Sequence, residues 1–570
     1  MKWHVKHLML APEEQLIQQD VFGRHALAEP LKQILIQRNI RTEGALDAYF
    51  SADLSHLHDP FLLQDMDIAV ERLSRALSNK ERVMVYGDYD VDGTTSVAMM
   101  SLFLKQQEFE VVSYIPDRYT EGYGLSFKGI QVAEKEQVTL MVVLDCGIRG
   151  HDKVRFANQR GIDVIICDHH IPGEELPPAQ AILNPKRPGC TYPFKELTGC
   201  GIGYKLICAC KKTWEVEQQQ EHLLEYLDLV ALSTACDLVP LISENRTLVS
   251  LGLQKLREAP APGISQLMKL AEGKRSWTVS DLVFFLGPHI NAAGRIGSAM
   301  EAVKVLMGKA PDAAAVALHE VNQKRKDLDK QITEEALELI KAEEIEQPRM
   351  STVLKAENWH KGVVGIVASR LIETYYRPTI VLTHSNGELV GSGRSIPGFD
   401  LHEALHTCKE HLLQFGGHTH AAGLKLQPEK YPAFKQAFEH EVRKALGDVR
   451  QEAPLSIDSE LSLTQINESF MDDLDKMRPF GPANRTPVFC AKEVQVLEAT
   501  VLKGVHLRLR VAQNYGAFEA IAFYMAEKWH QLGQPTFLHL AFQPYWDFWK
   551  DHARIKLRIK DFKSTNEILP

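Results

Sequence analysis

The sequence lacks the features that are typical of membrane proteins, secreted proteins and proteins with a structural zinc site. It contains no run of about 18 apolar residues, the length that a membrane-spanning helix needs. Its first residues, Met-Lys-Trp-His-Val-Lys, lack the apolar core of a secretory signal peptide, so we expect neither membrane insertion nor secretion. None of the nine cysteines belongs to a C-x-x-C pair. A structural zinc site is therefore not expected, and the pattern suits a reducing cytoplasm.

An excess of positive charge is also lacking. The formal net charge is −9, which argues against a protein that coats nucleic acid by bulk charge but leaves a local basic groove possible. Apolar residues make up 45% of the chain, an ordinary share for a globular protein. At about 100–200 residues per domain, a chain of 570 residues predicts three or four domains.

The strongest local signal is the stretch V-M-V-Y-G-D-Y-D-V-D-G-T-T-S at residues 83–96. A short apolar run ends at Gly87, and Asp88, Asp90 and Asp92 follow at alternate positions. If the extended conformation persists, alternate side chains share one face, and the three carboxylates converge. Converging carboxylates repel one another unless a cation lies among them, so the stretch predicts a divalent metal site.

Four interpretations compete for this stretch. A solvated acidic loop does not fit a cluster enclosed by apolar runs. An EF-hand loop needs a bidentate glutamate at its twelfth position, where this chain has Met99, and a helix before the loop. A haloacid-dehalogenase-type phosphatase matches Asp90 to Thr94 locally. A hydrolase with two metal ions requires further carboxylates and histidines on neighbouring strand ends.

The following residues alternate between strand-like and helix-like patterns. Strands are predicted at 111–116, 140–147 and 163–170, which indicates a parallel α/β sheet whose ligands lie beyond the carboxyl ends of its strands. Asp145 ends one strand, and Asp168-His169-His170 end another. Asp237 follows a further apolar segment, whereas its neighbour Asp228 is expected to face outward. Oxygen and imidazole ligands together favour Mn²⁺ or Mg²⁺ over structural zinc.

Four motifs in order resemble those of the DHH phosphoesterase superfamily. They are G-D-Y-D-V-D-G, V-L-D-C-G, D-H-H and S-T-A-C-D-L-V-P, and the whole chain resembles the RecJ branch of single-strand-specific 5′→3′ exonucleases. The dehalogenase alternative accounts for the first motif alone. The resemblance implies two metal ions, Mn²⁺ or Mg²⁺, held by Asp88, Asp90, Asp92, Asp145, His169 and Asp237, with Asp145 bridging and with Asp88 either a ligand or one step removed.

The resemblance also implies the residues that act on the substrate. His170 would face the scissile phosphate and Asp168 would orient its neighbours. L-G-P-H-I-N-A-A-G-R at 286–295 matches a further motif, in which Asn291 and Arg295 would face the active site. This chain has His289 where many relatives carry arginine, which puts a cationic role at that position in doubt.

Residues beyond 300 are expected to form a second and a third domain. Helical spacing over 301–347 predicts a connector helix, and G-S-G-R-S and F-G-G-H-T-H in the next hundred residues look like a DHHA1 domain. Glycines there permit close approach to phosphate. The family match implies a pocket for the 5′ end that is lined by Arg118, Ser392 and Arg394. It also implies a path for the strand that is lined by Arg370, His360 and His418.

Short alternating strands from 455 onward predict a small barrel, which the resemblance identifies as an OB-fold. Aromatic residues that include Trp546 and Trp549 precede a row of basic residues, a pattern that can stack bases and follow a backbone. The expected divisions are a helical lead-in packed on the core (1–80), a DHH domain (81–300), a connector (301–347), a DHHA1 domain (348–450) and the OB-fold (455–570).

The resulting prediction is a monomeric, cytoplasmic exonuclease that degrades single-stranded DNA from its 5′ end to mononucleotides during recombination and repair. The resemblance implies cooperation with single-strand-binding protein and a helicase. Two alternatives remain: a relative that acts on short oligonucleotides or RNA, and a strand-binding module with an inactive core. A complete set of metal ligands favours the enzyme, and the third domain favours long strands.

Overall fold

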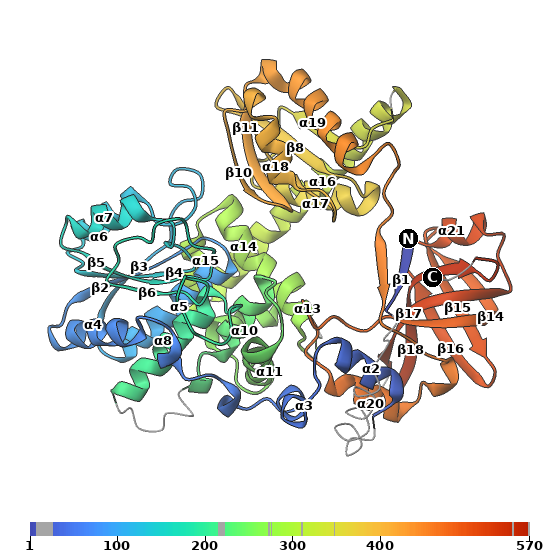
Figure 1. Cartoon of the computed structure of the whole chain (residues 1–570), viewed down its shortest axis with the longest axis horizontal. Helices are drawn as coiled ribbons and strands as arrows, with labels where there is room; N and C mark the ends of the chain where they lie inside the picture. The colour runs from blue at the N-terminus through green and yellow to red at the C-terminus, as the bar shows by residue number, and fades with distance from the viewer. Residues whose placement is uncertain are drawn as a thin grey trace. The chain divides into compact units, whose positions relative to one another are not determined.

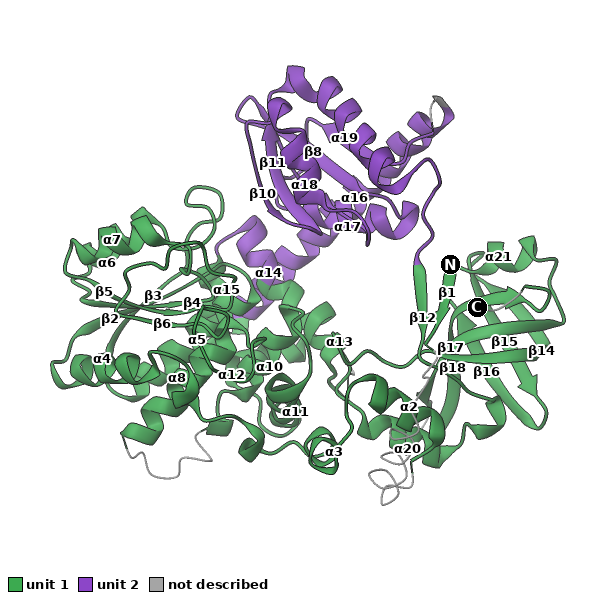
Figure 2. Cartoon of the chain, in the orientation of Figure 1, with its two compact units in different colours: residues 1–290, 299–312, 454–570 green, residues 291–298, 313–453 purple. Residues whose placement is uncertain are grey.

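The computed structural model describes residues 1–6, 27–214, 223–271, 274, 276–308, 312–346, 348–549 and 552–567. The chain divides into two compact units (Figure 2). Unit 1 contains residues 1–290, 299–312 and 454–570, and unit 2 contains residues 291–298 and 313–453. Within the described residues, no helix combines the length and apolar character needed to cross a membrane.

The core of unit 1 is a parallel sheet of five strands in the order β3-β2-β4-β5-β6. These strands are β3 (Glu110–Tyr114), β2 (Arg82–Gly87), β4 (Leu140–Leu144), β5 (Asp163–Cys167) and β6 (Ala181–Leu183). Every residue of β4 is buried, which explains its continuous apolar run. Figure 1 shows α6 (Phe127–Lys135) and α7 (His151–Asn158) over one face and α4 (Met66–Ser78), α5 (Val91–Gln106) and α8 (Gly199–Thr213) over the other. The predicted α/β core is confirmed.

Behind this sheet, α10 (Leu227–Cys236) packs against α5, α8 and α11 (Ser243–Glu258). Gly252 allows the close contact with α10, because a Cβ there would lie 2.2 Å from the Leu227 carbonyl oxygen. The expectation that Asp228 faces outward is wrong. Its carboxylate is fully buried, accepts a hydrogen bond from the Ala261 amide at 2.6 Å and lies 3.7 Å from Lys255 Nζ.

The N-terminal segment differs from the helical lead-in that the sequence predicts. Residues Lys2–Val5 form β1, which pairs in parallel with β12 (Pro454–Ile457). Buried Trp3 donates from its indole nitrogen to Asp561 at 2.8 Å, and α2 (Glu29–Gln37) inserts Leu31 and Ile34 into the core of the C-terminal barrel. An apolar helix face can pack on any apolar surface, so its spacing alone does not identify the partner. Of the lead-in, α4 does pack on the parallel sheet.

Unit 2 contains all but the first residue of the long helix α16 (Asp312–Glu346) and a sheet of five strands in the order β10-β11-β9-β8-β7. The strands are β10 (Gln414–His418), β11 (Ala421–Leu426), β9 (Glu388–Arg394), β8 (Thr379–Ser385) and β7 (Thr352–Ala356). Helix α17 (Val364–Tyr375) packs on β8 and β9, while α18 (Leu401–Thr407) and α19 (Tyr431–Leu446) contribute to a separate apolar core.

The C-terminal part of unit 1 is a closed barrel of five strands, as the sequence predicts. Its strands are β14 (Phe489–Leu502), β15 (His506–Gln513), β16 (Gly516–Ala522), β17 (Phe537–Trp549) and β18 (His552–Ser564). Pairing of β14 with β17 closes the barrel, and α21 (Ala526–Gln531) connects β16 to β17. Alternate residues of β15, such as Leu507 and Leu509, fill the interior, which leaves Arg508 and Arg510 outside.

Candidate metal centre

Three neighbouring strands deliver the predicted carboxylates and imidazoles to one edge of the parallel sheet. Asp88 follows β2, Asp145 follows β4, and Asp168, His169 and His170 follow β5. Asp237 arrives from another direction, as the C-cap residue of α10. Side chains of Asp92, His169 and Asp237, and those of Asp145, His169 and His170, present potential ligand atoms within 4.8 Å of one another.

The Asp88–Asp92 segment converges by a different route from the extended one expected. Helix α5 already begins at Val91, and the carboxylate of Asp90 caps its N-terminus by accepting a hydrogen bond from Gly93 N at 3.0 Å. A strand-to-helix turn therefore brings these acidic side chains together, because the turn reverses the direction of the chain directly below the sheet edge. Asp88 and Asp92 are buried and Asp90 is partly buried.

The carboxylate of Asp92 is held by four hydrogen-bond donors. The amides of Gly199 and Cys200, at the start of α8, donate at 2.7 and 2.8 Å, and the hydroxyls of Ser233 and Ser96 donate at 2.7 and 3.4 Å. The N-terminus of a helix favours an anion through its free amides and its dipole. A Cβ at Gly199 would lie 2.6 Å from the Cα of Asp145, so only glycine permits this close approach.

His169 is the centre of the cluster. Its Nε2 atom lies 3.2 Å from Asp145 Oδ1, 3.7 Å from Asp237 Oδ2 and 3.8 Å from Asp92 Oδ2. Both of its ring nitrogens are buried and lack a hydrogen-bond partner among the described residues. Burial lowers the pKa of His169, which favours the neutral imidazole. A neutral, unpartnered nitrogen that faces three carboxylates has the arrangement of a metal ligand.

Burial and mutual repulsion raise the pKa values of the carboxyl groups. Burial and the charge of Asp90 raise the pKa of Asp88 to about 8. Burial, followed by Asp92 and Asp90, raises the pKa of Asp237 to about 8. The pKa of Asp90 is also raised by burial and by Asp92, and burial holds the pKa of Asp145 well above its ordinary range. Converging carboxylates of this kind require either protons or a bound cation.

The residues present therefore fit a pair of divalent cations. Carboxylate oxygens and one imidazole nitrogen form the donor set, without a thiolate. The orphaned nitrogens of His169 and the raised carboxyl pKa values are both what a site for cations would produce in the absence of those cations. We propose that its ligands are Asp88, Asp90, Asp92, Asp145, His169 and Asp237.

His170 is oriented by Asp168 beneath it. The Asp168 carboxylate, which is fully buried, accepts a hydrogen bond from Ile148 N at 2.9 Å and contacts His170 Nδ1 at 2.7 Å. Burial alone would lower the pKa of His170, but the hydrogen bond and the charge of Asp168 raise it. The same contact, with the other hydrogen bonds, keeps the pKa of Asp168 low despite its burial. Asp168 thus orients the partly exposed imidazole of His170 beside the proposed metal ligands and favours its protonated form.

Two tyrosines that the sequence analysis missed also border the centre. The Tyr123 hydroxyl lies 3.1 Å from His170 Nε2, and its ring meets that of Tyr89 edge to face at 6.4 Å. The guanidinium of Arg118 lies over the Tyr89 ring, 4.7 Å from its centroid, and its charge favours ionisation of Asp88. Tyr123 stands between Gly122 and Gly124, both with positive φ, so a glycine-flanked aromatic residue is a signal that could have identified it.

Several predicted substrate residues converge in unit 2, at the N-terminus of α17. Arg394 Nη1 donates to Ser392 Oγ at 2.7 Å, and Arg295 Nη1 donates to the Gly362 carbonyl at 3.1 Å. His360 Nδ1 accepts a hydrogen bond from Gly362 N at 3.1 Å. A Cβ at Gly365 would lie 3.1 Å from both Arg394 and Ser392. Two guanidinium groups and a hydroxyl beside the N-terminus of a helix form an arrangement suited to phosphate.

The other residues predicted to contact the substrate differ in burial and in hydrogen bonding. Arg370 forms a bidentate pair with buried Asp329 of α16, at 2.7 to 2.9 Å, and remains half-exposed. His418 is exposed and in register with Ala421, which pairs with Arg394, so His418 and Arg394 share one face of the sheet. Asn291 lies in unit 2 and is partly buried. His289 is buried and contacts the Phe285 carbonyl at 2.6 Å.

The two tryptophans proposed to stack bases both belong to β17. Trp546 is partly buried and packs against the barrel core, so only the remainder of its ring is available to a base. The side chain of Trp549 lies outside the described residues. Tyr545, from the same strand, has Arg558 over its ring, with the guanidinium 5.4 Å from the centroid.

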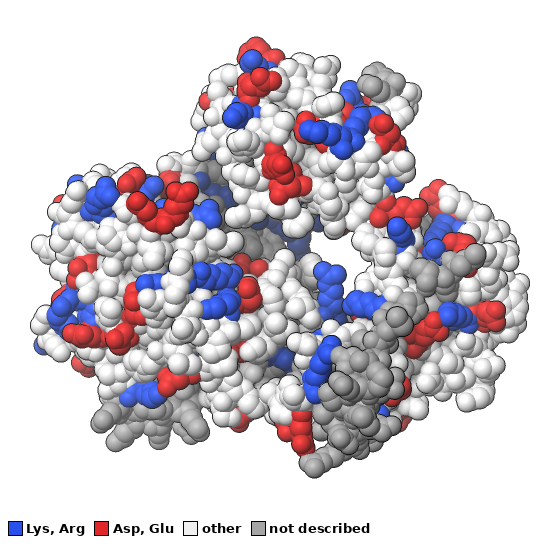
Figure 3. Space-filling view, viewed as in Figure 1, with Lys and Arg blue, Asp and Glu red and all other residues white. Residues whose placement is uncertain are grey.

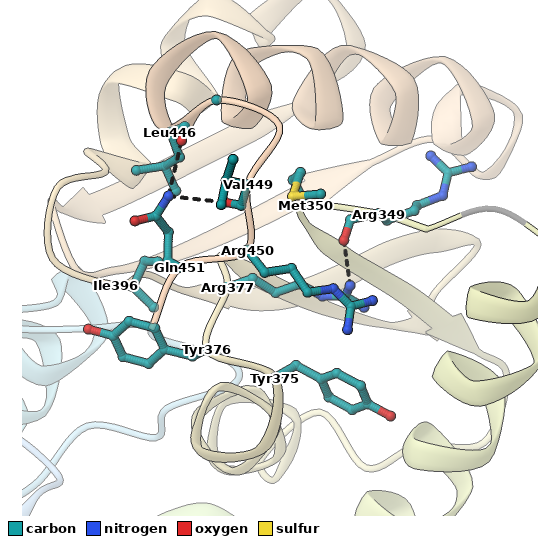
Figure 4. Close-up of a pocket in the computed structure, with 11 residues that line it drawn as sticks. Arg349, Met350, Tyr375, Tyr376, Arg377, Ile396, Leu446, Val449, Arg450 and Gln451 are labelled. Atoms are coloured by element: carbon teal, nitrogen blue, oxygen red, sulfur yellow. Dashed lines mark hydrogen bonds between the residues drawn. The ribbon is translucent and has the colours of Figure 1, made fainter. Parts of the chain in front are cut away.

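Figure 4 shows a cavity in unit 2 that Tyr375, at the C-terminal end of α17, helps to line. The Ser392–Arg394 pair lies beside Gly365, at the opposite end of that helix. Twelve helical residues separate the two ends, or roughly 18 Å. Arg377 points into this region but donates to Glu344, to the Arg349 carbonyl at 2.6 Å and to Thr352 Oγ1 at 2.7 Å. Gln451 bonds the carbonyls of Leu446 and Val449. The cavity is lined by residues 349–350, 375–377, 396 and 446–451, and the Arg377 guanidinium and the Gln451 amide beside it already bond to the protein.

The centre and the fold together define a class: metal-dependent phosphoesterases with a DHH core. Residues 82–234 match the model of the DHH family N-terminal domain, residues 350–444 match the DHHA1 domain, and residues 457–561 match the RecJ OB domain. The dehalogenase alternative is thereby set aside, because it accounts for none of the later domains.

The particular family follows from relatives that match most of the chain. The single-stranded-DNA-specific exonuclease RecJ of Bacillus subtilis is 32% identical, and the alignment covers 98% of this chain and 70% of that protein. The RecJ protein of Escherichia coli is 35% identical, with 86% of this chain and 88% of that protein covered. The crystal structure of RecJ from Thermus thermophilus in complex with Mn²⁺ superposes with a TM-score of 0.83, at 26% identity, over 100% of this chain and 80% of that one. The chain belongs to the RecJ family.

Proposed function

We propose that this chain is a single-strand-specific 5′→3′ exodeoxyribonuclease that acts in DNA recombination and repair. The observation that supports this most strongly is the convergence of Asp92, Asp145, His169 and Asp237 at one sheet edge in a chain that shares all three RecJ domains. The activity is hydrolysis of phosphodiester bonds with release of mononucleotides. The proposed domain divisions are those expected from the sequence, except that β1 and α2 pack with the barrel.

The proposed catalytic residues divide into metal ligands and substrate groups. Mn²⁺ and Mg²⁺ are the expected ions, since RecJ of Thermus thermophilus has been solved with each. When bound, two such ions lower the pKa of a water molecule, align it with phosphorus and neutralise charge on the departing 3′ oxygen. His169 and the carboxylates hold the ions. His170, whose protonated form Asp168 favours, donates a hydrogen bond to a phosphate oxygen and stabilises its growing negative charge.

Replacing Asp168 with asparagine is expected to lower kcat/KM about 10- to 100-fold, the usual cost of losing the partner that orients a functional histidine. The pKa of His170 falls without the carboxylate, so activity at alkaline pH is lost at a lower pH than in the wild type. Steady-state rates from pH 6 to pH 10 measure both effects. Asp152→Asn is the control, because Asp152 is an exposed carboxylate 3.8 Å from another histidine, His151. An unchanged alkaline limb would contradict the proposed role of Asp168.

Binding of the 5′ end is proposed for Ser392 and Arg394, because these groups lie beside the N-terminus of α17. Arg118 is proposed to contact a substrate phosphate near Asp88. Arg370, His360 and His418 are proposed to contact the strand, and Asn291 and Arg295 to assist at the scissile bond. Of these, Arg370 is the most constrained, because its guanidinium already forms three hydrogen bonds with Asp329.

Replacing Arg394 with alanine is expected to remove the preference for a 5′-phosphate. A hydrogen bond to a charged group contributes about 1.5–3 kcal/mol, so the ratio of kcat/KM for 5′-phosphorylated over 5′-hydroxyl strands should fall about 10- to 100-fold. Lys425→Ala is the matched control, since Lys425 is an exposed cation on the same sheet face, four residues from Ala421 along β11. An equal loss on both kinds of strand would mean that Arg394 acts elsewhere on the substrate.

The barrel is proposed to bind the strand beyond the cleaved end. Arg508 and Arg510 on β15 and Arg558 on β18 are exposed, while Tyr545 and Trp546 supply aromatic surface. Basic groups follow a phosphate backbone and aromatic faces stack bases without regard to sequence. Acidic and basic side chains are intermixed on the molecular face shown in Figure 3. This supports local rather than bulk electrostatic attraction.

Single-stranded DNA with a 5′ end is the proposed substrate, and single-strand-binding protein and a helicase are the proposed partners. A cytoplasmic location and a monomeric state are proposed as well. The test of the function is a gel with end-labelled DNA and RNA strands of either polarity, with Mn²⁺, Mg²⁺ or a chelator. Release of mononucleotides from the 5′ end of long DNA is expected. Preference for RNA or for oligonucleotides of a few residues would favour the alternative, a phosphodiesterase of short substrates.

A further inference from the structure

A fourth strand end meets the edge that carries the metal centre. β6 lies beside β5, with Leu183 in register with Cys167, and Asp168 N donates to the Leu183 carbonyl at 3.1 Å. The next residue, Asn184, is 1% exposed. Residues beyond the carboxyl ends of parallel strands are where α/β proteins bind their ligands. The segment after β6 therefore lies at the same ligand-binding edge of the sheet as the segments after β2, β4 and β5.

Asn184 ties this segment to the metal centre. Its Nδ2 donates to the carbonyl of His170 at 2.9 Å, and its Oδ1 accepts a hydrogen bond from the Lys186 amide at 2.8 Å. One buried side chain thus fixes the backbone at His170 and at Lys186 together. A buried amide with both ends satisfied holds its neighbours in a single arrangement. The backbone from which the Lys186 side chain extends is thereby fixed relative to His170.

Lys186 lies two residues beyond Asn184, in the segment that the Asn184 side chain ties to the His170 carbonyl. Burial is the main cause of the lowered pKa of His169 and of the raised pKa of Asp237, and the charge of the Lys186 ammonium adds a smaller lowering effect at both groups. The side chain is 25% exposed, and its Nζ lies 3.3 Å from Glu196 Oε2. Arg118 acts in the same way on Asp88. Lys186 is therefore a partly exposed cationic residue in a segment that is held against His170.

A simple ion pair does not account for this placement. Pairs between exposed groups contribute little to stability, and Glu196 is 38% exposed. A lysine beside metal ligands also repels the cations that those ligands hold, which is unfavourable unless an anion lies between them. A phosphodiester is such an anion, because its non-bridging oxygens carry the charge that both the ions and an ammonium can neutralise.

We propose that Lys186 is a catalytic residue whose ammonium binds a non-bridging oxygen of the phosphodiester under attack, and that Asn184 is its positioning residue. This inference rests on the proposed nuclease function and adds a substrate contact to it. In the hydrolysis, water forms a new bond to phosphorus, the P–O3′ bond breaks, and the departing 3′ oxygen ends protonated. Lys186 forms no covalent bond in this sequence. It stabilises the negative charge that accumulates on the phosphoryl oxygens.

The test compares Lys186→Met, which keeps the aliphatic stem, with Lys186→Arg, which keeps the charge. Loss of one charge-stabilising group costs about 10²- to 10³-fold in kcat, so Lys186→Met should lose at least that lower amount, and Lys186→Arg should retain most of the rate. Lys195→Met is the matched control, because Lys195 lies in the same segment but donates to the Cys190 carbonyl at 2.8 Å. That variant should behave as the wild type does.

A second measurement separates catalysis from structural damage. Mn²⁺ binding, followed by titration calorimetry, should be as tight in Lys186→Met as in the wild type or tighter, because a repelling charge has been removed. Asn184→Ala should lose less activity than Lys186→Met, and the double variant should be no worse than Lys186→Met alone, since the two residues act through one contact.

Three results would overturn the inference. They are wild-type turnover in Lys186→Met, loss of Mn²⁺ binding and turnover together in both Lys186 variants, and fully additive losses in the double variant. Failure of the proposed function is distinguishable from all three. In that case the wild type itself would leave single-stranded DNA intact, whereas failure of this inference alone would leave wild-type hydrolysis in place.

Discussion

An Asp145→Asn protein is expected to lose turnover on every substrate, whatever its length, polarity or 5′ group. Asp145 is buried, lies 3.2 Å from His169 and is the proposed bridging ligand. Loss of the charge stabilisation that a metal ion supplies amounts to several kcal/mol, so kcat should fall by about 10³-fold or more. Asparagine is preferred to alanine here because Asp145 has φ +59°, a conformation that asparagine tolerates well.

The Asp145→Asn substitution is also expected to change the melting temperature, in opposite directions without and with metal ions. Without metal ions, Asp145→Asn should melt at a higher temperature than the wild type, because it removes one of several repelling buried carboxyl groups. With Mn²⁺ present, the order should reverse, since only the wild type gains from binding the ions. Calorimetric melting curves with chelator and with Mn²⁺ check both statements. Near-normal turnover with Mn²⁺ would show that Asp145 is not the bridging ligand.

Removal of metal ions is expected to make the stability of the protein fall as pH rises. The pKa values of Asp88 and Asp237 are each raised to about 8 in the folded protein, against an ordinary value of 3.8. A carboxyl group with a raised pKa contributes its stability fully below the unfolded pKa and loses it as pH rises through the folded pKa. In the presence of chelator, the free energy of unfolding should therefore fall by several kcal/mol in total between pH 4 and pH 8.

Mn²⁺ should reverse that loss, and most strongly at alkaline pH. The ions need ionised carboxylates, so the rise in melting temperature on adding Mn²⁺ should be larger at pH 8 than at pH 6. Because other groups in the chain also titrate, the informative quantity is the difference between the wild type and Asp145→Asn at each pH. A difference that stays constant across this range would show that the carboxyl groups of the centre do not carry the raised pKa values.

The sequence was sufficient for the architecture and for most of the centre. Apolar runs that end in Asp88, Asp145 and Asp168 predict a parallel sheet, and parallel strands present their carboxyl ends at one edge. Because that rule depends only on chain direction, the meeting of these residues follows without any knowledge of packing. The connector helix and the barrel follow from their periodicities in the same way.

Other features followed only from packing. Asp92 reaches the centre because α5 begins at Val91 and α8 supplies two amides to its carboxylate, which an extended chain would not allow. Asp228 is buried rather than exposed, since the Ala261 amide and Lys255 come from outside its own helix. The pattern of a segment shows which of its faces is apolar or polar. It does not identify the distant residues that this face contacts in the folded protein.

By itself, the sequence determined which residue types stand at the strand ends, and therefore the metal-dependent chemistry of the protein. The tertiary structure alone decided that β1 and α2 pack with the barrel, that Tyr123 contacts His170, and that Asn184 joins Lys186 to the centre. The physical reason is one of range. Strand direction and periodicity act between neighbours in the chain, whereas these contacts join residues that only folding brings within a few ångströms.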